Sequence, residues 1–170
     1  SDVFAVQDDI ARSVVGQLRA TLAGGGPATL VRRETDDPEA HALYLQGLFA
    51  WNRRTAPMVR KAIELFEQAA RRDPNYARPH AGIAMAYVVL PVYDDVPNEE
   101  TMSKAMDAAR RALALDSLLP EAHATIGLVN AYYFNNSEAE RSFAKALTLD
   151  SSFATAHFWR AILLGQVGRL

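Results

Sequence analysis

Residues 137–157, Ser-Glu-Ala-Glu-Arg-Ser-Phe-Ala-Lys-Ala-Leu-Thr-Leu-Asp-Ser-Ser-Phe-Ala-Thr-Ala-His, contain the pattern that decides the fold of this chain. Alanine and phenylalanine recur in it at spacings of four and three, Leu149 and Asp150 follow, and a short connection leads to the next apolar stretch. Two upstream segments repeat the pattern, with Ala62, Phe66, Ala69 and Asp73 in one and Ala105, Ala109, Ala112 and Asp116 in the other. Spacings of three and four place side chains on one face of a helix. The sequence therefore predicts an array of helical repeats.

Two independent sets of landmarks measure the length of the repeating unit. Three aspartates (Asp73, Asp116 and Asp150) and three histidines (His80, His123 and His157) each give successive separations of 43 and 34 residues. One unit is therefore 34 residues long, and the unit before it has nine extra residues. Because the segment 91–98 holds two prolines and two aspartates, the extra residues are expected at about 90–98, between two helices.

The sequence divides into three parts. Residues 1–23 predict one amphipathic helix, because apolar side chains recur at helical spacing from Phe4 to Leu22. The run Gly24-Gly25-Gly26-Pro27 ends this helix, and the linker spans 24–37. Residues 38–170 are expected to form the repeat domain, with units at about 40–76, 77–119 and 120–153 and a partial unit at 154–170. The partner of the last helix is expected to lie outside the sequence.

Start and stop signals give the bounds of the expected helices. Asp37 is the expected N-cap of a helix that has Pro38 in its first position. Asn98 is expected to cap a helix that starts at Glu99, and Ser137 with Glu140 has capping-box spacing. The segment 91–98 is expected to be a break. The expected helices cover 39–53, 57–72, 78–90 and 99–114, followed by a pair that starts at Pro120 and turns at Asn135-Asn136, and a last helix from about Ala154 to Gly165.

The repeating unit resembles the tetratricopeptide repeat, a 34-residue helix-turn-helix unit. Its characteristic positions read Gly47, Ala62, Phe66, Ala69 and Pro74, then Ala84, Ala105, Ala109, Ala112 and Ser117, then Gly127, Ala139, Phe143, Ala146 and Ser151. The resemblance implies an all-α fold, a right-handed superhelical array of antiparallel helix pairs with about three and a half repeats plus the N-terminal helix. The segment 2–11 also resembles the stretch before such arrays in bacterial multidomain regulators, which carry a DNA-binding, nucleotide-cyclase or kinase domain earlier in the chain.

In tetratricopeptide arrays the first helices of the pairs line a concave groove, and the resemblance implies which residues here face it. They are Tyr44, Leu48, Trp51, Asn52, Arg78, Met85, Val88, Leu128, Tyr132, Phe158 and Ile162. Because this surface is largely apolar and aromatic, we expect a protein or peptide segment to cover it. Trp51 and Tyr132 are the expected anchors, since large rigid aromatic side chains dominate interfaces. Arrays that clamp acidic tails need cationic and amide donors where this chain has mainly apolar residues, which argues against that mode of recognition.

Two other interpretations stay open. In the first, the helix at 2–22 or tight curvature of the array fills the groove, and Trp51 and Tyr132 are ordinary core residues. In the second, the array is a structural module that self-associates through its terminal helices or spaces other domains. The favoured hypothesis is a protein–protein interaction module within a larger bacterial signalling or transcriptional regulator.

Composition and motifs argue against several other classes of function. A formal net charge of −2 provides no dense cationic face, so this domain is not expected to bind nucleic acid. The sequence has no cysteine, phosphate-binding loop or nucleophile beside a base, so no enzyme activity, catalytic residue or cofactor is expected. Equivalent histidines in successive repeats lie ~10 Å apart, too far to share a metal ion. No apolar run has the length of a membrane span and no leader opens the chain, so a cytoplasmic location is expected.

Overall fold

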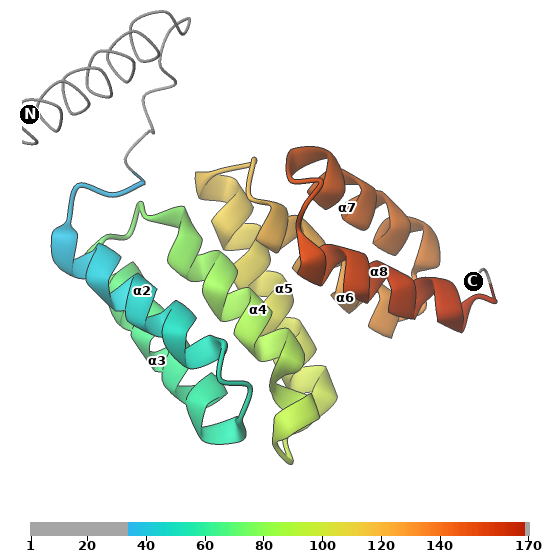
Figure 1. Ribbon diagram of the computed structural model, residues 1–170, viewed down its shortest axis with the longest axis horizontal. Helices are drawn as coiled ribbons and strands as arrows, with labels where there is room; N and C mark the ends of the chain where they lie inside the picture. Colours follow the sequence, from blue (N-terminus) through green and yellow to red (C-terminus); the bar gives the residue numbers. More distant parts are fainter. Residues whose placement is uncertain (1–33, 169–170) are drawn as a thin grey trace, which may run out of the picture. The chain divides into compact units, whose positions relative to one another are not determined.

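The computed structural model describes residues 34–168, so the helix expected at 2–22 and most of the expected linker lie outside the described residues. The described part of the chain contains α2 (Pro38–Trp51), α3 (Ala56–Arg72), α4 (Ala77–Tyr93), α5 (Asn98–Leu115), α6 (Pro120–Tyr132), α7 (Asn136–Leu149) and α8 (Ala154–Gln166). Figure 1 shows these helices stacked in a layered array. The expected all-α architecture is therefore confirmed. No helix within residues 34–168 is both long enough and apolar enough to cross a membrane.

The helices pack as consecutive pairs. α2 packs against α3, α4 against α5 and α6 against α7, and neighbouring pairs meet through α3 with α4 and α5 with α6. The first helices of the pairs also contact one another, α2 with α4, α4 with α6 and α6 with α8, so they share one side of the stack. Because a single pair cannot bury its apolar face alone, the contacts between pairs complete the core.

Glycine permits the closest helix contacts in this core. Phe66 of α3 is fully buried, and its ring lies between Gly47 of α2 and Gly82 of α4. A Cβ atom added to Gly47 would lie 2.5 Å from Cε1 of Phe66, and one added to Gly82 would lie 2.8 Å from Cε2. A Cβ atom added to Gly127 of α6 would likewise lie 2.8 Å from Cδ1 of Phe143 in α7. A ring facing a glycine therefore explains why small residues and phenylalanine recur together in the repeat.

The recurring aspartates end the second helix of each pair. The backbone N–H groups of Asp73, Asp116 and Asp150 still donate to carbonyl oxygens four residues earlier. Each Oδ1 atom then accepts a hydrogen bond from the backbone N–H two residues later, at 2.9 to 3.0 Å. This Asx turn offers the backbone an alternative to continued helix. The aspartates used as landmarks in the sequence therefore mark the same structural turn in each unit.

The break expected at 91–98 is wrong over its first three residues, because α4 continues through Pro91 to Tyr93. Pro91 lies in the last turn of α4, so its missing N–H affects only the end of the helix. α4 is four residues longer than α6, α5 is four residues longer than α7, and their connection is one residue longer. The nine-residue insertion therefore lengthens both helices of the pair by about one turn.

The N-cap predicted for the first helix of the array is confirmed. Oδ1 of Asp37 accepts hydrogen bonds from the backbone N–H groups of Glu39 and Ala40, at 2.9 and 3.0 Å. Its second oxygen, Oδ2, accepts a hydrogen bond from Nε of Arg72, at 2.8 Å. Asp37 therefore caps α2 and also links its start to the end of α3.

The other two predicted caps are wrong. Asn98 is the first residue of α5, and Pro97 occupies the cap position. α7 begins before Ser137 and has no side-chain cap. Glu140 accepts a hydrogen bond from Arg160 of α8, at 3.0 Å.

Candidate binding groove

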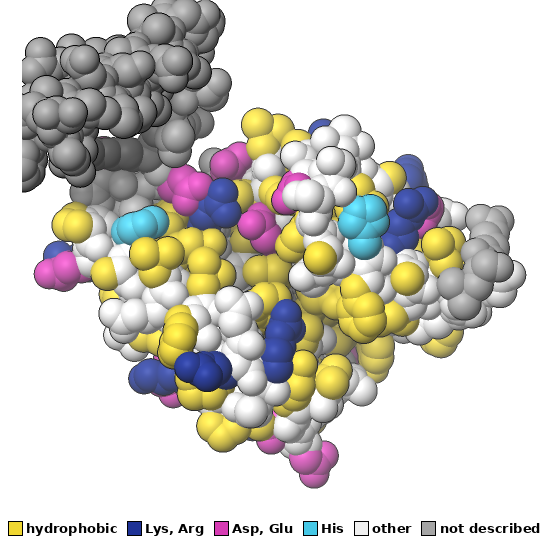
Figure 2. Space-filling model, in the orientation of Figure 1, with side chains coloured by type: hydrophobic (Ala, Val, Ile, Leu, Met, Phe, Trp, Pro, Cys, Tyr) yellow, Lys and Arg dark blue, Asp and Glu magenta, His cyan; other side chains and the backbone are white. Residues whose placement is uncertain are grey.

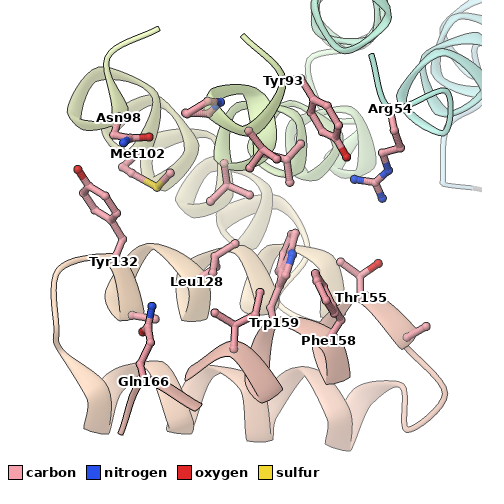
Figure 3. A pocket seen from close by; sticks show the side chains of 17 residues that line it. Arg54, Tyr93, Asn98, Met102, Leu128, Tyr132, Thr155, Phe158, Trp159 and Gln166 are labelled. Carbon is pink, nitrogen blue, oxygen red and sulfur yellow. The ribbon is translucent and has the colours of Figure 1, made fainter. Parts of the chain in front are cut away.

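An open groove of about 740 Å³ is lined by residues of α4, α5, α6 and α8 and of the turn after α2. Its lining residues are Arg54, Val88, Val89, Pro91, Val92, Tyr93, Asn98, Met102, Leu128, Ala131, Tyr132, Ala154, Thr155, Phe158, Trp159, Ile162 and Gln166. Figure 3 shows side chains of both walls directed into the space between them. Most of these described residues are aliphatic or aromatic, and Arg54 alone among them is charged. The groove is therefore suited to an apolar surface.

The nine-residue insertion supplies much of one wall. Pro91, Val92 and Tyr93 belong to the extra turn of α4, and Asn98 and Met102 belong to the start of α5. Four additional helical residues extend each helix by ~6 Å. A pair of regular length would lack Pro91, Val92, Tyr93 and Asn98. The lengthened pair therefore supplies part of the groove that a regular pair would not form.

Several apolar side chains of the groove are open to solvent. Val92 is 76% exposed, Phe158 64%, and Tyr132 and Ile162 both 39%. Beneath them, Trp159 is 4% exposed and Val88 is 3% exposed, so the floor is part of the packed core. Contiguous exposed apolar surface of this kind marks interaction sites in soluble proteins. Figure 2 shows hydrophobic side chains gathered on the face in view.

Arg54 lies in the turn between α2 and α3, with a φ of 52° in the left-handed region that few residues other than glycine adopt. Its guanidinium carbon is 3.5 Å from the centroid of the Trp51 ring, which places the cation over the aromatic face. No carboxylate within residues 34–168 forms an ion pair with Arg54. Trp51 therefore holds a cation at the edge of the groove without neutralising it.

Five of the eleven residues expected to face a groove line this one: Val88, Leu128, Tyr132, Phe158 and Ile162. Trp51 is only 7% exposed and lies beneath Arg54, outside the lining. Met85 is 5% exposed within the core, and Leu48 is half-buried against it. Asn52 is exposed at the C-terminal end of α2.

The other two predicted residues, Tyr44 and Arg78, belong to a separate polar and aromatic cluster. The rings of Tyr44 and Tyr76 meet edge to face with centroids 5.4 Å apart, and burial raises the pKa of both phenols. Arg78 forms ion pairs with Glu34 and Glu121, with 3.3 Å between Nη1 and Oε1 of Glu121. The charge of Arg78 is thus matched within the array, unlike that of Arg54.

Sequence reasoning missed the wall built by Pro91, Val92 and Tyr93, and it missed Arg54. The nine-residue insertion was the available signal for the wall, but its prolines indicated a break. No sequence pattern indicates that Arg54 lines the groove, because the position of its side chain depends on a left-handed backbone conformation and on stacking with Trp51.

The repeat histidines hold turns between units. Nε2 of His123 lies 3.0 Å from the carbonyl oxygen of Ser117, and Nε2 of His157 lies 2.9 Å from that of Ser151. The part of the chain that the structure describes contains no cluster of three side chains able to hold a metal ion. A local hydrogen bond therefore accounts for these two recurring histidines.

Curated relatives of the chain include two kinds of bacterial protein. A putative adenylate cyclase 3 of Rhizobium meliloti is 28% identical over 144 residues, which cover 83% of this chain and 24% of that protein. Transcriptional regulator HilA of Salmonella typhimurium is 24% identical over 137 residues, which cover 79% of this chain and 25% of the regulator. The chain therefore spans about a quarter of the length of these relatives. No family model matches it.

Solved structures with a similar fold share a repeat architecture. A tetratricopeptide-repeat protein of Thermus thermophilus has a TM-score of 0.66 at 22% identity, covering 78% of this chain and 67% of that one. The Sgt2 repeat domain of Aspergillus fumigatus has a TM-score of 0.60 at 19% identity, covering 81% and 84%. The first repeat domain of Spaghetti (RPAP3), bound to the HSP90 peptide SRMEEVD, has a TM-score of 0.60 at 17% identity, covering 80% and 98%. The chain thus has the fold of a tetratricopeptide-repeat array.

Proposed function

We propose that this chain is a protein–protein interaction module that binds a peptide or helix in the groove between α4, α6 and α8. The observation that carries the proposal is the combination of exposed Phe158, Val92 and Ile162 with a buried apolar floor. A stable partner would remove these side chains from water at a gain of about 25 cal/mol per Å² of apolar surface. No catalytic role is proposed.

A segment of protein fits this groove better than a small molecule. Small-molecule sites bury most of the ligand surface. Here the lining residues Val92 and Phe158 are 76% and 64% exposed, so the groove is open along its length. A small ligand would leave much of its own surface in water, whereas a longer partner can cover both walls.

The comparisons support an interaction role and suggest its setting. Spaghetti (RPAP3), a protein of similar fold, binds an acidic peptide of HSP90. Because most of the lining here is apolar, we propose a partner that presents apolar side chains. The relatives in Rhizobium meliloti and Salmonella are a putative cyclase and a transcriptional regulator. We propose that the module belongs to a larger bacterial signalling or transcriptional regulator located in the cytoplasm.

A matched pair of phenylalanines tests the site. Phe158 is 64% exposed in the groove and Phe49 is 61% exposed on α2, outside the lining, so replacing either costs little stability. Peptides selected on the chain from a displayed library provide the probe, with affinity measured by fluorescence anisotropy. Phe158→Ala should weaken binding about tenfold, because buried aromatic anchors dominate interfaces, and Phe49→Ala should change it less than about twofold. Failure to select any peptide, or equal effects of the two substitutions, would refute the proposal.

Self-association is a second candidate, because apolar residues are also exposed on the first described helix of the array. Leu45 of α2 is 49% exposed and Phe49 is 61% exposed, while α8 exposes Phe158 and Ile162. Contacts between the α2 face of one copy and the α8 face of another would bury both surfaces. Sedimentation over a concentration range separates the candidates. A monomer at all concentrations would rule out assembly.

A further inference from the structure

We propose that the occupant of the groove is an amphipathic α-helix of a partner protein that directs a carboxylate to Arg54. This inference rests on the proposed function, which it makes more specific in two respects, the conformation of the partner and its charge. The helical conformation follows from the scarcity of hydrogen-bonding groups on the groove floor. The negative charge follows from the Arg54 guanidinium, which forms no ion pair within residues 34–168.

The floor of the groove favours a partner that satisfies its own backbone. Val88, Val89, Leu128, Ala131 and Trp159 carry no side-chain oxygen and only one side-chain nitrogen, so they offer almost no partners for hydrogen bonds. A bound extended segment would leave unpaired those of its N–H and C=O groups that face this floor, and each buried unpaired group is costly. An α-helix pairs these groups internally and presents side chains at i, i+3, i+4 and i+7. The groove therefore selects a helix over an extended peptide.

The charge of the groove is concentrated at one end. In Figure 3, Arg54 lies with Tyr93 near one end of the groove, while Asn98, Tyr132 and Gln166 lie near the other. The second end thus has polar groups without charge. A carboxylate at one end of the partner helix would therefore lie near Arg54 in one orientation of the helix. In the reverse orientation it would lie at the end of the groove that has no cation.

The guanidinium of Arg54 is placed to receive this carboxylate. Its cationic group is fixed over the Trp51 ring at 3.5 Å, which reduces the side-chain freedom that an ion pair would otherwise have to restrict. Arg54 has no carboxylate partner within residues 34–168, in contrast with Arg60, Arg72, Arg78 and Arg160, each of which pairs with an acidic residue. An incoming carboxylate would meet a cation that is already oriented.

A selection experiment tests the inference even though the natural partner is unidentified. A displayed library of amphipathic helical peptides, with its apolar stripe held constant and the flanking positions randomised, is selected on the wild-type chain and on Arg54→Gln. The neighbouring Arg53 provides the matched control, because its guanidinium lies 4.6 Å from the exposed Phe49 ring and outside the groove. We expect acidic residues to be enriched at one end of the stripe with wild type and Arg53→Gln, and this preference to disappear with Arg54→Gln.

One selected peptide and its Glu→Gln form then give the size of the effect. Wild type and Arg53→Gln should bind the Glu peptide about fivefold more tightly than the Gln peptide, whereas Arg54→Gln should bind both alike. Peptides that bind through Phe158 without an acidic preference would overturn the inference and leave the proposed function standing. An acidic preference that survives Arg54→Gln would also overturn it. Absence of any helical binder would refute the inference, and absence of binders from any library would refute the proposed function.

Discussion

The contact between Gly47 and Phe66 allows the packing of α2 against α3 to be tested with one methyl group. In Gly47→Ala, the added Cβ would lie 2.5 Å from Cε1 and 2.6 Å from Cδ1 of Phe66, closer than carbon atoms pack. The ring cannot move away freely, because its other edge faces Gly82 at a Cβ distance of 2.8 Å. Overpacking of this kind costs up to about 3 kcal/mol, and the higher helix propensity of alanine offsets about 1 kcal/mol. We expect a net loss of about 2 kcal/mol.

The loss is measured as the free energy of unfolding in urea, followed by circular dichroism. Phe66→Leu in the Gly47→Ala background provides the control, because the smaller side chain leaves room for the new methyl group. The two substitutions together should therefore cost less than the sum of their separate effects. A Gly47→Ala variant that is about 1 kcal/mol more stable than wild type would show that the ring yields without strain, and the packing argument would fail.

Two further predictions concern single polar groups. Nε1 of Trp51 is buried without a hydrogen-bond partner in the described structure, so removal of this atom in Trp51→Phe should offset much of the cost of the smaller ring; the free energy of unfolding should fall by less than about 1 kcal/mol, and a larger decrease in urea denaturation would contradict this. The backbone N–H of Ala40 and the Arg72 side chain lower the pKa of Asp37 from its ordinary value of 3.8, so this stabilisation is present above that value and is lost as the pH falls through the folded pKa. In Asp37→Asn the free energy of unfolding should therefore fall less as the pH is lowered than it does in wild type. If the free energy of unfolding depended on pH identically in both proteins, this would count against the ion pair between Asp37 and Arg72.

The repeat units, their pairing and most helix bounds could be predicted from the sequence because local chemistry sets them. Helical spacing identifies the faces that pack. The Asx turns of Asp73 and Asp150 end helices through contacts within two residues of themselves, so the same signal recurs at the same structural point. The cap formed by Asp37 is predictable for the same reason.

The groove wall could not be predicted because contacts between distant residues override its local signals. Pro91 and Asp94 indicate a break, yet Leu90 is buried and Val96 packs against the core. Nε of Arg60 in α3 also lies 2.5 Å from Oδ2 of Asp94 and anchors the lengthened end of α4. Burial and this ion pair support the extra turn, and they are visible only once the helices are placed side by side.

The choice of Trp51 as an anchor illustrates a second limit. Its repeat position assigns it to the groove, whereas in the structure it is buried and covered by the Arg54 guanidinium. Phe158, Tyr132 and Tyr93 are the aromatic residues that reach the open part of the groove. The sequence pattern therefore identifies the helices that line the groove more reliably than the side chains that line it.

The fluorescence of Trp159 tests most directly whether the groove is the binding site. The chain has two tryptophans, so Trp51→Phe, which keeps an aromatic ring for the Arg54 guanidinium, leaves Trp159 as the only reporter, and Trp159 lies in the groove floor at 4% exposure. Titration with a selected helical peptide that lacks tryptophan should give a saturable change in emission with the same Kd as the anisotropy measurement. Binding by anisotropy with no change in Trp159 emission would place the partner elsewhere and contradict the account.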